Sequence, residues 1–188
     1  MADFKMINLK NFTYGYQAID MNHLSLIQGL LVSSKPKKIL ELGVGTGNVS
    51  QVCLDAIQHN QVGHLTCIDN WQDWKGNIPK IAVELKKLGA EIITKSEKDF
   101  VHENLDARFD FIISDGAHGG SHKWCNKLYD MLNRGGVLIA HDVTNPHFTN
   151  LREYQIEARR RRYDSMTFSE STRKDERCER GLLVVYKS

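Results

Sequence analysis

Residues 38–48 of the chain read Lys-Ile-Leu-Glu-Leu-Gly-Val-Gly-Thr-Gly-Asn. The apolar run at 39–42 predicts a short strand, and apolar residues recur at helical spacing from Val49 to Ile57. The three glycines between these segments permit positive φ values and let a ligand approach the backbone closely. Because the following helix would point its free N–H groups at that ligand, the stretch predicts a ligand-binding strand–turn–helix unit.

The spacing of the glycines distinguishes between kinds of ligand. A dinucleotide fingerprint, Gly-x-Gly-x-x-Gly, would need glycine at position 48, where Asn48 stands. A phosphate-binding P-loop needs Gly-Lys-Ser/Thr, which this turn lacks. Glu41 would repel a pyrophosphate and suits a ligand that carries an ammonium or sulfonium group. The alternative is a purely structural turn with a solvated Glu41.

Outward from this turn, apolar strand-like runs alternate with helical periodicities. We expect strands at 39–42, 64–68, 91–94, 109–114, 137–140, 166–170 and 182–187, and helices over 22–32, 49–57, 78–88, 124–132 and 150–162. Gly89 is the expected C-terminal cap of the third helix, and Arg134-Gly135-Gly136 is expected to close the fourth. This alternation predicts one α/β domain over residues 1–188, a parallel sheet with helices on both faces.

A second acidic residue, Asp69, ends the second expected strand. A carboxylate at such a strand end can accept hydrogen bonds from both hydroxyls of a ribose. The alternative is that Asp69 caps a turn or helix. Trp71 and Trp74 follow closely, and they either cover a nucleoside with an apolar face or belong to the core.

Composition excludes several other classes of protein. The chain has 41% hydrophobic residues and a net charge of +2, so no strong field selects nucleic acid. Its four cysteines show no zinc-finger spacing, and no signal peptide or apolar run long enough to span a membrane is present. We therefore expect a cytoplasmic protein. The basic run 159–162 is interleaved with acidic residues, which is typical of a solvated, salt-bridged surface rather than an RNA site.

These features together resemble class I S-adenosylmethionine-dependent methyltransferases, and within that superfamily the small-molecule O-methyltransferases. The resemblance covers roughly residues 22–142 and the terminal strand pair. It is carried, besides the glycine turn, by four strand-end motifs: Ile68-Asp69-Asn70-Trp71, Asp115-Gly116-Ala117-His118, Gly135-Gly136 and His141-Asp142. It implies a Rossmann-like, doubly wound sheet of seven strands in the order 3-2-1-4-5-7-6, with strand 7 antiparallel.

The resemblance also assigns positions to the cofactor. Glu41, Gly43, Gly45 and Gly47 would surround its methionine end, and Asp69, with Asn70 and Trp71 beside it, would hold the ribose. Ser96 and Glu97 would lie near the adenine, and Asp115 beside the reacting methyl group. Residues 1–21 would form an N-terminal arm, which either folds over the cofactor as a lid or packs as an ordinary terminal arm.

Methyl transfer from a sulfonium needs proximity and a deprotonated acceptor, and four polar residues follow the fourth and fifth strands: Asp115, His118, His141 and Asp142. In metal-dependent relatives of the catechol type an Asp-Asn pair follows strand five, but Val143 stands where that Asn would be. Two mechanisms stay open. Asp115 and Asp142 hold Mg²⁺ or another divalent cation, or His118 acts as the general base. The structural alternative is that these residues cap loops.

We expect O-methylation of a small-molecule hydroxyl of the sugar or phenol type, with no nucleic-acid or membrane partner, and we leave a homodimer open. The alternatives are an RNA or protein methyltransferase, another S-adenosylmethionine-using enzyme of the same fold such as an aminopropyl transferase or a lyase, and a non-catalytic binding module.

Overall fold

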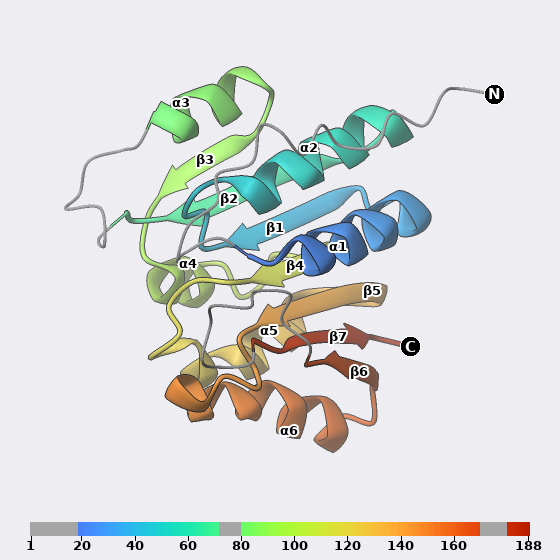
Figure 1. Cartoon of the computed structure of the whole chain (residues 1–188), viewed down its shortest axis with the longest axis vertical. Helices are drawn as coiled ribbons and strands as arrows, with labels where there is room; N and C mark the ends of the chain where they lie inside the picture. Colours follow the sequence, from blue (N-terminus) through green and yellow to red (C-terminus); the bar gives the residue numbers. More distant parts are fainter. Residues whose placement is uncertain (1–18, 72–79, 170–179) are drawn as a thin grey trace.

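The computed structural model describes residues 19–71, 80–169 and 180–188. Within them a seven-stranded sheet has the strand order β3-β2-β1-β4-β5-β7-β6 (Figure 1). Neighbouring strands from β3 to β5 are parallel, while β7 is antiparallel to both β5 and β6. The expected strand order and the reversed last strand are confirmed.

The bounds of the elements are as follows. The strands are β1 (Lys38–Leu42), β2 (His64–Asp69), β3 (Glu91–Thr94), β4 (Phe109–Ser114), β5 (Leu132–His141), β6 (Asp164–Phe168) and β7 (Leu182–Tyr186). The helices are α1 (Met21–Ser34), α2 (Asn48–Asn60), α3 (Lys80–Lys87), α4 (Glu97–Glu103), α5 (Cys125–Met131) and α6 (Arg152–Arg160), with short 3₁₀ segments η3 (Ser121–Lys123) and η4 (Pro146–Leu151).

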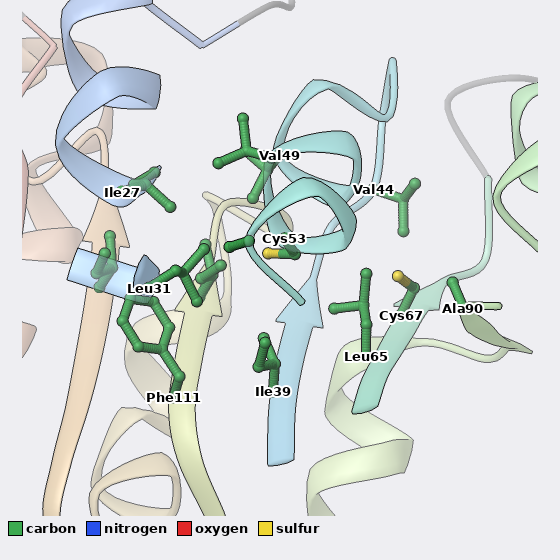
Figure 2. Close-up of a cluster of buried hydrophobic side chains, with 14 of the residues drawn as sticks. Ile27, Leu31, Ile39, Val44, Val49, Cys53, Leu65, Cys67, Ala90 and Phe111 are labelled. Atoms are coloured by element: carbon green, nitrogen blue, oxygen red, sulfur yellow. The ribbon is translucent and has the colours of Figure 1, made fainter. Parts of the chain in front are cut away.

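Two hydrophobic cores lie on opposite faces of the sheet because successive strand residues point to opposite sides. Ile39 and Phe111 belong to the core under α1 and α2, whereas their neighbours Leu40 and Ile112 belong to the core under α4, α5 and α6. Figure 2 shows part of the first core, where Ile27 and Leu31 from α1 approach Phe111 and residues of α2 lie over β1 and β2. Strands buried on both faces explain the continuous apolar runs in the sequence.

Two details differ from the sequence-based expectation. Strand β5 begins at Leu132, so Arg134-Gly135-Gly136 lies inside a strand and does not close the preceding helix. The pairing of β5 with β4 shifts there, and Gly135 has φ 78 while its N–H donates to the carbonyl of Lys187. A Cβ at Gly136 would come within 2.9 Å of the Asp110 carbonyl, which explains the second glycine.

Helix α4 was not expected. It has seven residues and few apolar side chains, so its periodicity is weak. A capping signal was available, since Ser96 accepts a hydrogen bond from the N–H of Asp99 at its first turn.

The basic run near the C-terminus has the salt-bridged character that its sequence indicated. Glu157, on α6, pairs with Arg160 and Arg161, and Arg161 also pairs with Asp130. Among the described residues, no helix is long and apolar enough to cross a membrane.

Candidate active site

The candidate residues gather where the parallel strands end. The arrowheads of β1, β3 and β5 point to the same edge of the sheet in Figure 1. Asp115 directly follows β4, and Asp142 directly follows β5, whose last residue is His141. Open α/β sheets bind ligands at this edge because the loops that diverge there leave a crevice.

Four of these side chains form a closed cluster. His118 Nε2 lies 2.8 Å from Asp142 Oδ2 and 3.7 Å from Asp115 Oδ1. His141 Nδ1 lies 2.8 Å from Asp115 Oδ1 and 3.8 Å from Asp142 Oδ2. Each imidazole therefore has one close carboxylate and one more distant one. These are the same four residues that the sequence predicted at the ends of the fourth and fifth strands.

The cluster perturbs the protonation of its members. Burial alone would lower the pKa of His118, but the carboxylates of Asp115 and Asp142 raise it to about 10. The same carboxylates raise the pKa of His141 against the effect of burial. Conversely, burial would raise the pKa of Asp115, but His141 and His118 hold it well below its usual range. The two carboxylates therefore favour the protonated form of His118 over the neutral form that a general base requires.

Sequence reasoning missed a third imidazole. His23, on α1, is 2% exposed, and its ring lies edge-on to that of His141 with the centroids 5.5 Å apart. Neither ring nitrogen of His23 has a hydrogen-bond partner in the part of the chain that the structure describes. Burial and the neighbouring His141 lower its pKa to about 4. A signal existed, because position 23 falls on the same helical stripe as Ile27 and Leu31.

A small recess adjoins the cluster. It is lined by Ser114, Asp115, Gly116, His118, Ser121, His141, Leu151 and Tyr154. The Tyr154 and Ser114 hydroxyls are 2.9 Å apart, and the Phe148 ring lies 4.9 Å from that of His118. The described side chains leave no room for a water molecule in the recess, so a ligand would have to displace some of them.

The three glycines of the turn have different surroundings, although all have positive φ. A Cβ at Gly43 would lie 2.4 Å from Gly116 Cα, so these two loops touch backbone to backbone. A Cβ at Gly47 would collide with Ile81 of α3. At Gly45, by contrast, no described atom lies within 4 Å of the Cβ position. Of the three glycines, Gly45 is the one beside which the described residues leave open space.

Asp69 holds the same turn in place. Its Oδ2 accepts hydrogen bonds from the N–H groups of Val44 and Gly45, and its Oδ1 accepts one from Trp71. Asn70 is exposed beside it. Trp71 is 1% exposed and packs in the core under α1 and α2, which is the second of the two interpretations of this tryptophan.

Glu41 lies beneath the turn and is fully buried, so the alternative of a solvated Glu41 is wrong. Its Oε2 accepts hydrogen bonds from the Ser50 hydroxyl at 2.6 Å and the Cys67 thiol at 3.3 Å. Burial raises the pKa of Glu41 to about 8, against the opposing effect of these two donors.

Glu97 extends from the start of α4 to the loop after β4. Its Oε1 accepts a hydrogen bond from the N–H of Ala117, while its Oε2 is buried without a partner in the described ranges. Burial raises its pKa to about 7. Ser96 is occupied as the cap of α4. Trp74 and the aromatic part of the N-terminal arm lie outside the described residues.

Comparison with known proteins agrees with this geometry. Residues 40–143 match a family model described as a methyltransferase domain. No curated protein sequence matches the chain.

Several solved structures share the fold. The O-methyltransferase TomG from Streptomyces achromogenes, solved with S-adenosylmethionine, has a TM-score of 0.71 at 16% identity over 96% of this chain and 86% of its own. The O-methyltransferase from Bacillus cereus, solved with S-adenosylhomocysteine, has a TM-score of 0.72 at 15% identity, over 92% of this chain and 84% of its own. The methyltransferase PaMTH1 from Podospora anserina has a TM-score of 0.65 at 13% identity, over 95% of this chain and 83% of its own.

Proposed function

The chain belongs to the methyltransferase domain family, and we propose that it transfers the methyl group of S-adenosylmethionine to a hydroxyl oxygen of a small molecule. The observation that carries this proposal is the cluster of Asp115, His118, His141 and Asp142 at the end of the strands within the matched segment. Such a cluster can activate an oxygen nucleophile beside a bound cofactor.

The residues along the strand ends fit the cofactor. Bound S-adenosylmethionine would supply a methyl group on a positively charged sulfur. The open space at Gly45 admits a ligand to the turn, and the unpartnered Oε2 of Glu97 offers an acceptor for an amine such as that of adenine.

We propose the following division of roles. Gly43, Gly45 and Gly47 shape the methionine end, and the buried carboxyl of Glu41 supports this end from beneath through its hydrogen bonds with Ser50 and Cys67. Asp69 and Asn70 bind the ribose, Ser96 and Glu97 flank the adenine, and Trp71 supports this region by packing. Asp69 already accepts three hydrogen bonds from the protein, and its Oδ1, which accepts one of them, has a second lone pair for a ribose hydroxyl.

Asp115 lies between the cofactor loops and the recess, so it is placed to orient the acceptor against the methyl group. Of the two activation mechanisms, the charges at the cluster favour the cation alternative. His118 carries a proton between two carboxylates and is therefore a poor base at neutral pH, whereas Asp115 and Asp142 already hold positive charge at this place. A divalent cation there would lower the pKa of an acceptor hydroxyl.

The recess indicates a polar acceptor. The hydroxyl groups of Ser114, Ser121 and Tyr154 line it together with the two imidazoles. These groups suit an acceptor with several hydroxyls, such as a sugar, with a phenol as the second class.

Binding and turnover test the proposal separately. Calorimetry should give micromolar affinity for S-adenosylmethionine, roughly −7 to −8 kcal/mol. Incubation with panels of sugars and phenols should release S-adenosylhomocysteine, and Asp115→Asn should abolish that release while the cofactor still binds. Tighter binding of NAD than of S-adenosylmethionine would refute the cofactor assignment. Release that depends on RNA or protein acceptors would refute the acceptor class.

A further inference from the structure

We propose that the cluster is a transition-metal site in which His118 and His141 are ligands together with Asp115, and that Asp142 stands beside the site as the partner of His118. Such a site takes Mn²⁺, Fe²⁺, Co²⁺ or Zn²⁺ in preference to Mg²⁺. The proposal deepens the proposed function, because it names the kind of ion that activates the acceptor at the same site.

Four side-chain atoms form a ring in which nitrogen and oxygen alternate. Around this ring, from His118 Nε2 through Asp142 Oδ2, His141 Nδ1 and Asp115 Oδ1, the sides measure 2.8, 3.8, 2.8 and 3.7 Å. Three of the residues, Asp115, His118 and His141, have ligand atoms that all lie within 4.8 Å of one another. With metal–ligand bonds of about 2.0–2.3 Å, neighbouring ligand atoms are separated by about 2.8–3.8 Å. These three residues therefore have the spacing of ligands to one ion, and Asp142 adjoins them through His118.

The chemical types of the donor atoms indicate which class of metal ion the site prefers. Mg²⁺ prefers oxygen ligands and keeps several of its waters, so a site in which two of the three protein donors are imidazoles suits it poorly. Imidazole nitrogen binds first-row transition ions well, with affinity rising from Mn²⁺ towards the end of the series. Binding of the ion displaces to solvent the protons that His118 and His141 carry at these nitrogens, and the carboxylates of Asp115 and the adjacent Asp142 then balance the charge of the ion.

The surroundings of the ring give an independent indication that a ligand belongs there. His141 Nε2 and both ring nitrogens of His23 are buried without hydrogen-bond partners among the residues described. Nearly all buried polar groups in folded proteins are satisfied, so three unpaired nitrogens on two adjacent imidazoles need an explanation. A water held by the ion can supply a partner for a nitrogen of His23, whose ring lies 5.5 Å from that of His141, whereas Nε2 of His141 points away from the ion.

The test titrates Co²⁺, Zn²⁺ and Mg²⁺ separately into the EDTA-treated full chain, without cofactor or acceptor. Calorimetry and the visible absorption of bound Co²⁺ are the readouts. We expect one ion per chain and Co²⁺ affinity at least about 100-fold above that for Mg²⁺. His118→Ala and His141→Ala should each weaken Co²⁺ binding by about tenfold or more.

Two further variants sharpen the result. His141→Asp exchanges a nitrogen donor for oxygen, and it should narrow the preference for Co²⁺ over Mg²⁺ by about tenfold or more. His64→Ala removes an exposed histidine at the opposite end of β2 and should change nothing. If the buried His141 variants fail to fold, His118→Ala, at a side chain that is 26% exposed, still tests the proposal.

Equal affinity for Mg²⁺ and Co²⁺, or unchanged Co²⁺ affinity in His118→Ala, would overturn the proposal. Its failure differs from that of the proposed function: a protein that binds S-adenosylmethionine but not Co²⁺ refutes only the metal site. One that binds Co²⁺ but not S-adenosylmethionine refutes the cofactor assignment alone.

Discussion

Replacing Glu41 by Gln should change how the stability of the protein depends on pH. Glu41 is fully buried, and its pKa is raised from 4.5 to about 8 chiefly by that burial. In the unfolded chain the carboxyl ionises near its ordinary pKa, but in the native protein it keeps its proton until about pH 8. Below pH 4.5 both states are protonated and the group contributes no pH dependence.

Between these two values the unfolded state loses the proton first, so native stability falls as the pH rises. Each pKa unit corresponds to about 1.36 kcal/mol, and the whole shift therefore corresponds to at most about 5 kcal/mol by pH 8. Gln has the shape of the protonated form and does not ionise, so Glu41→Gln should escape this loss. Its carbonyl oxygen can still accept from Ser50, the closer of the two donors.

Urea denaturation of the ligand-free protein, followed by circular dichroism at several pH values from 4.5 to 9, measures the effect. The free energy of unfolding of Glu41→Gln minus that of the wild type should increase steadily with pH and level off above about pH 8. Glu84→Gln, on the exposed side of α3, is the matched control and should give a flat difference. A flat difference for Glu41→Gln as well would refute the argument.

The remaining predictions concern the cofactor, the third imidazole and the basic run. Asp69→Asn should weaken S-adenosylmethionine binding by about 1–3 kcal/mol in calorimetry, because charged hydrogen bonds to ribose are lost; unchanged affinity would leave Asp69 with the structural role of holding the turn. His23→Leu should raise the free energy of unfolding by about 1–3 kcal/mol by removing unpaired buried nitrogens, yet lower turnover; increased stability with full turnover would exclude a role in the reaction. Replacing both Arg159 and Arg162 by Gln should leave turnover within a few-fold, since both are exposed, and a large salt-sensitive loss of acceptor affinity would contradict this.

Much of the fold was predictable because burial leaves a periodic trace in the sequence. The runs around Leu40 and Ile112 are apolar at every position since both faces of those strands are covered. Helix α4 has no such trace, because so short a helix needs only Phe100 and Val101 to attach it to the core. The early start of β5 was not predicted for a related reason. Gly135 and Gly136 were interpreted as the end of a helix, but glycines also permit a β-bulge.

The site was predictable in position but not in electrostatics. Strand-end motifs bring Asp115 and His118 to one edge of the sheet, and parallel topology adds His141 and Asp142. The protonation of His118 depends instead on distances to two carboxylates, one of them 24 positions away in the chain. His23 comes from a helix before the first strand, and nothing in its local sequence says which loop it will face.

The contact between Gly43 and Gly116 sets a limit on how this enzyme can diversify. Main chain meets main chain there, and the side chain of Glu97 packs against the same place, so the turn and the loop that carries Asp115 are held at a fixed spacing. Under the proposed function, changes at Ser121 or Tyr154, which line the recess, would alter acceptor preference without altering that spacing. Even one added methyl group at either glycine would push the two loops apart and so separate the methyl donor from the acceptor. Substitutions at these two positions should therefore impair transfer to every substrate rather than select among substrates.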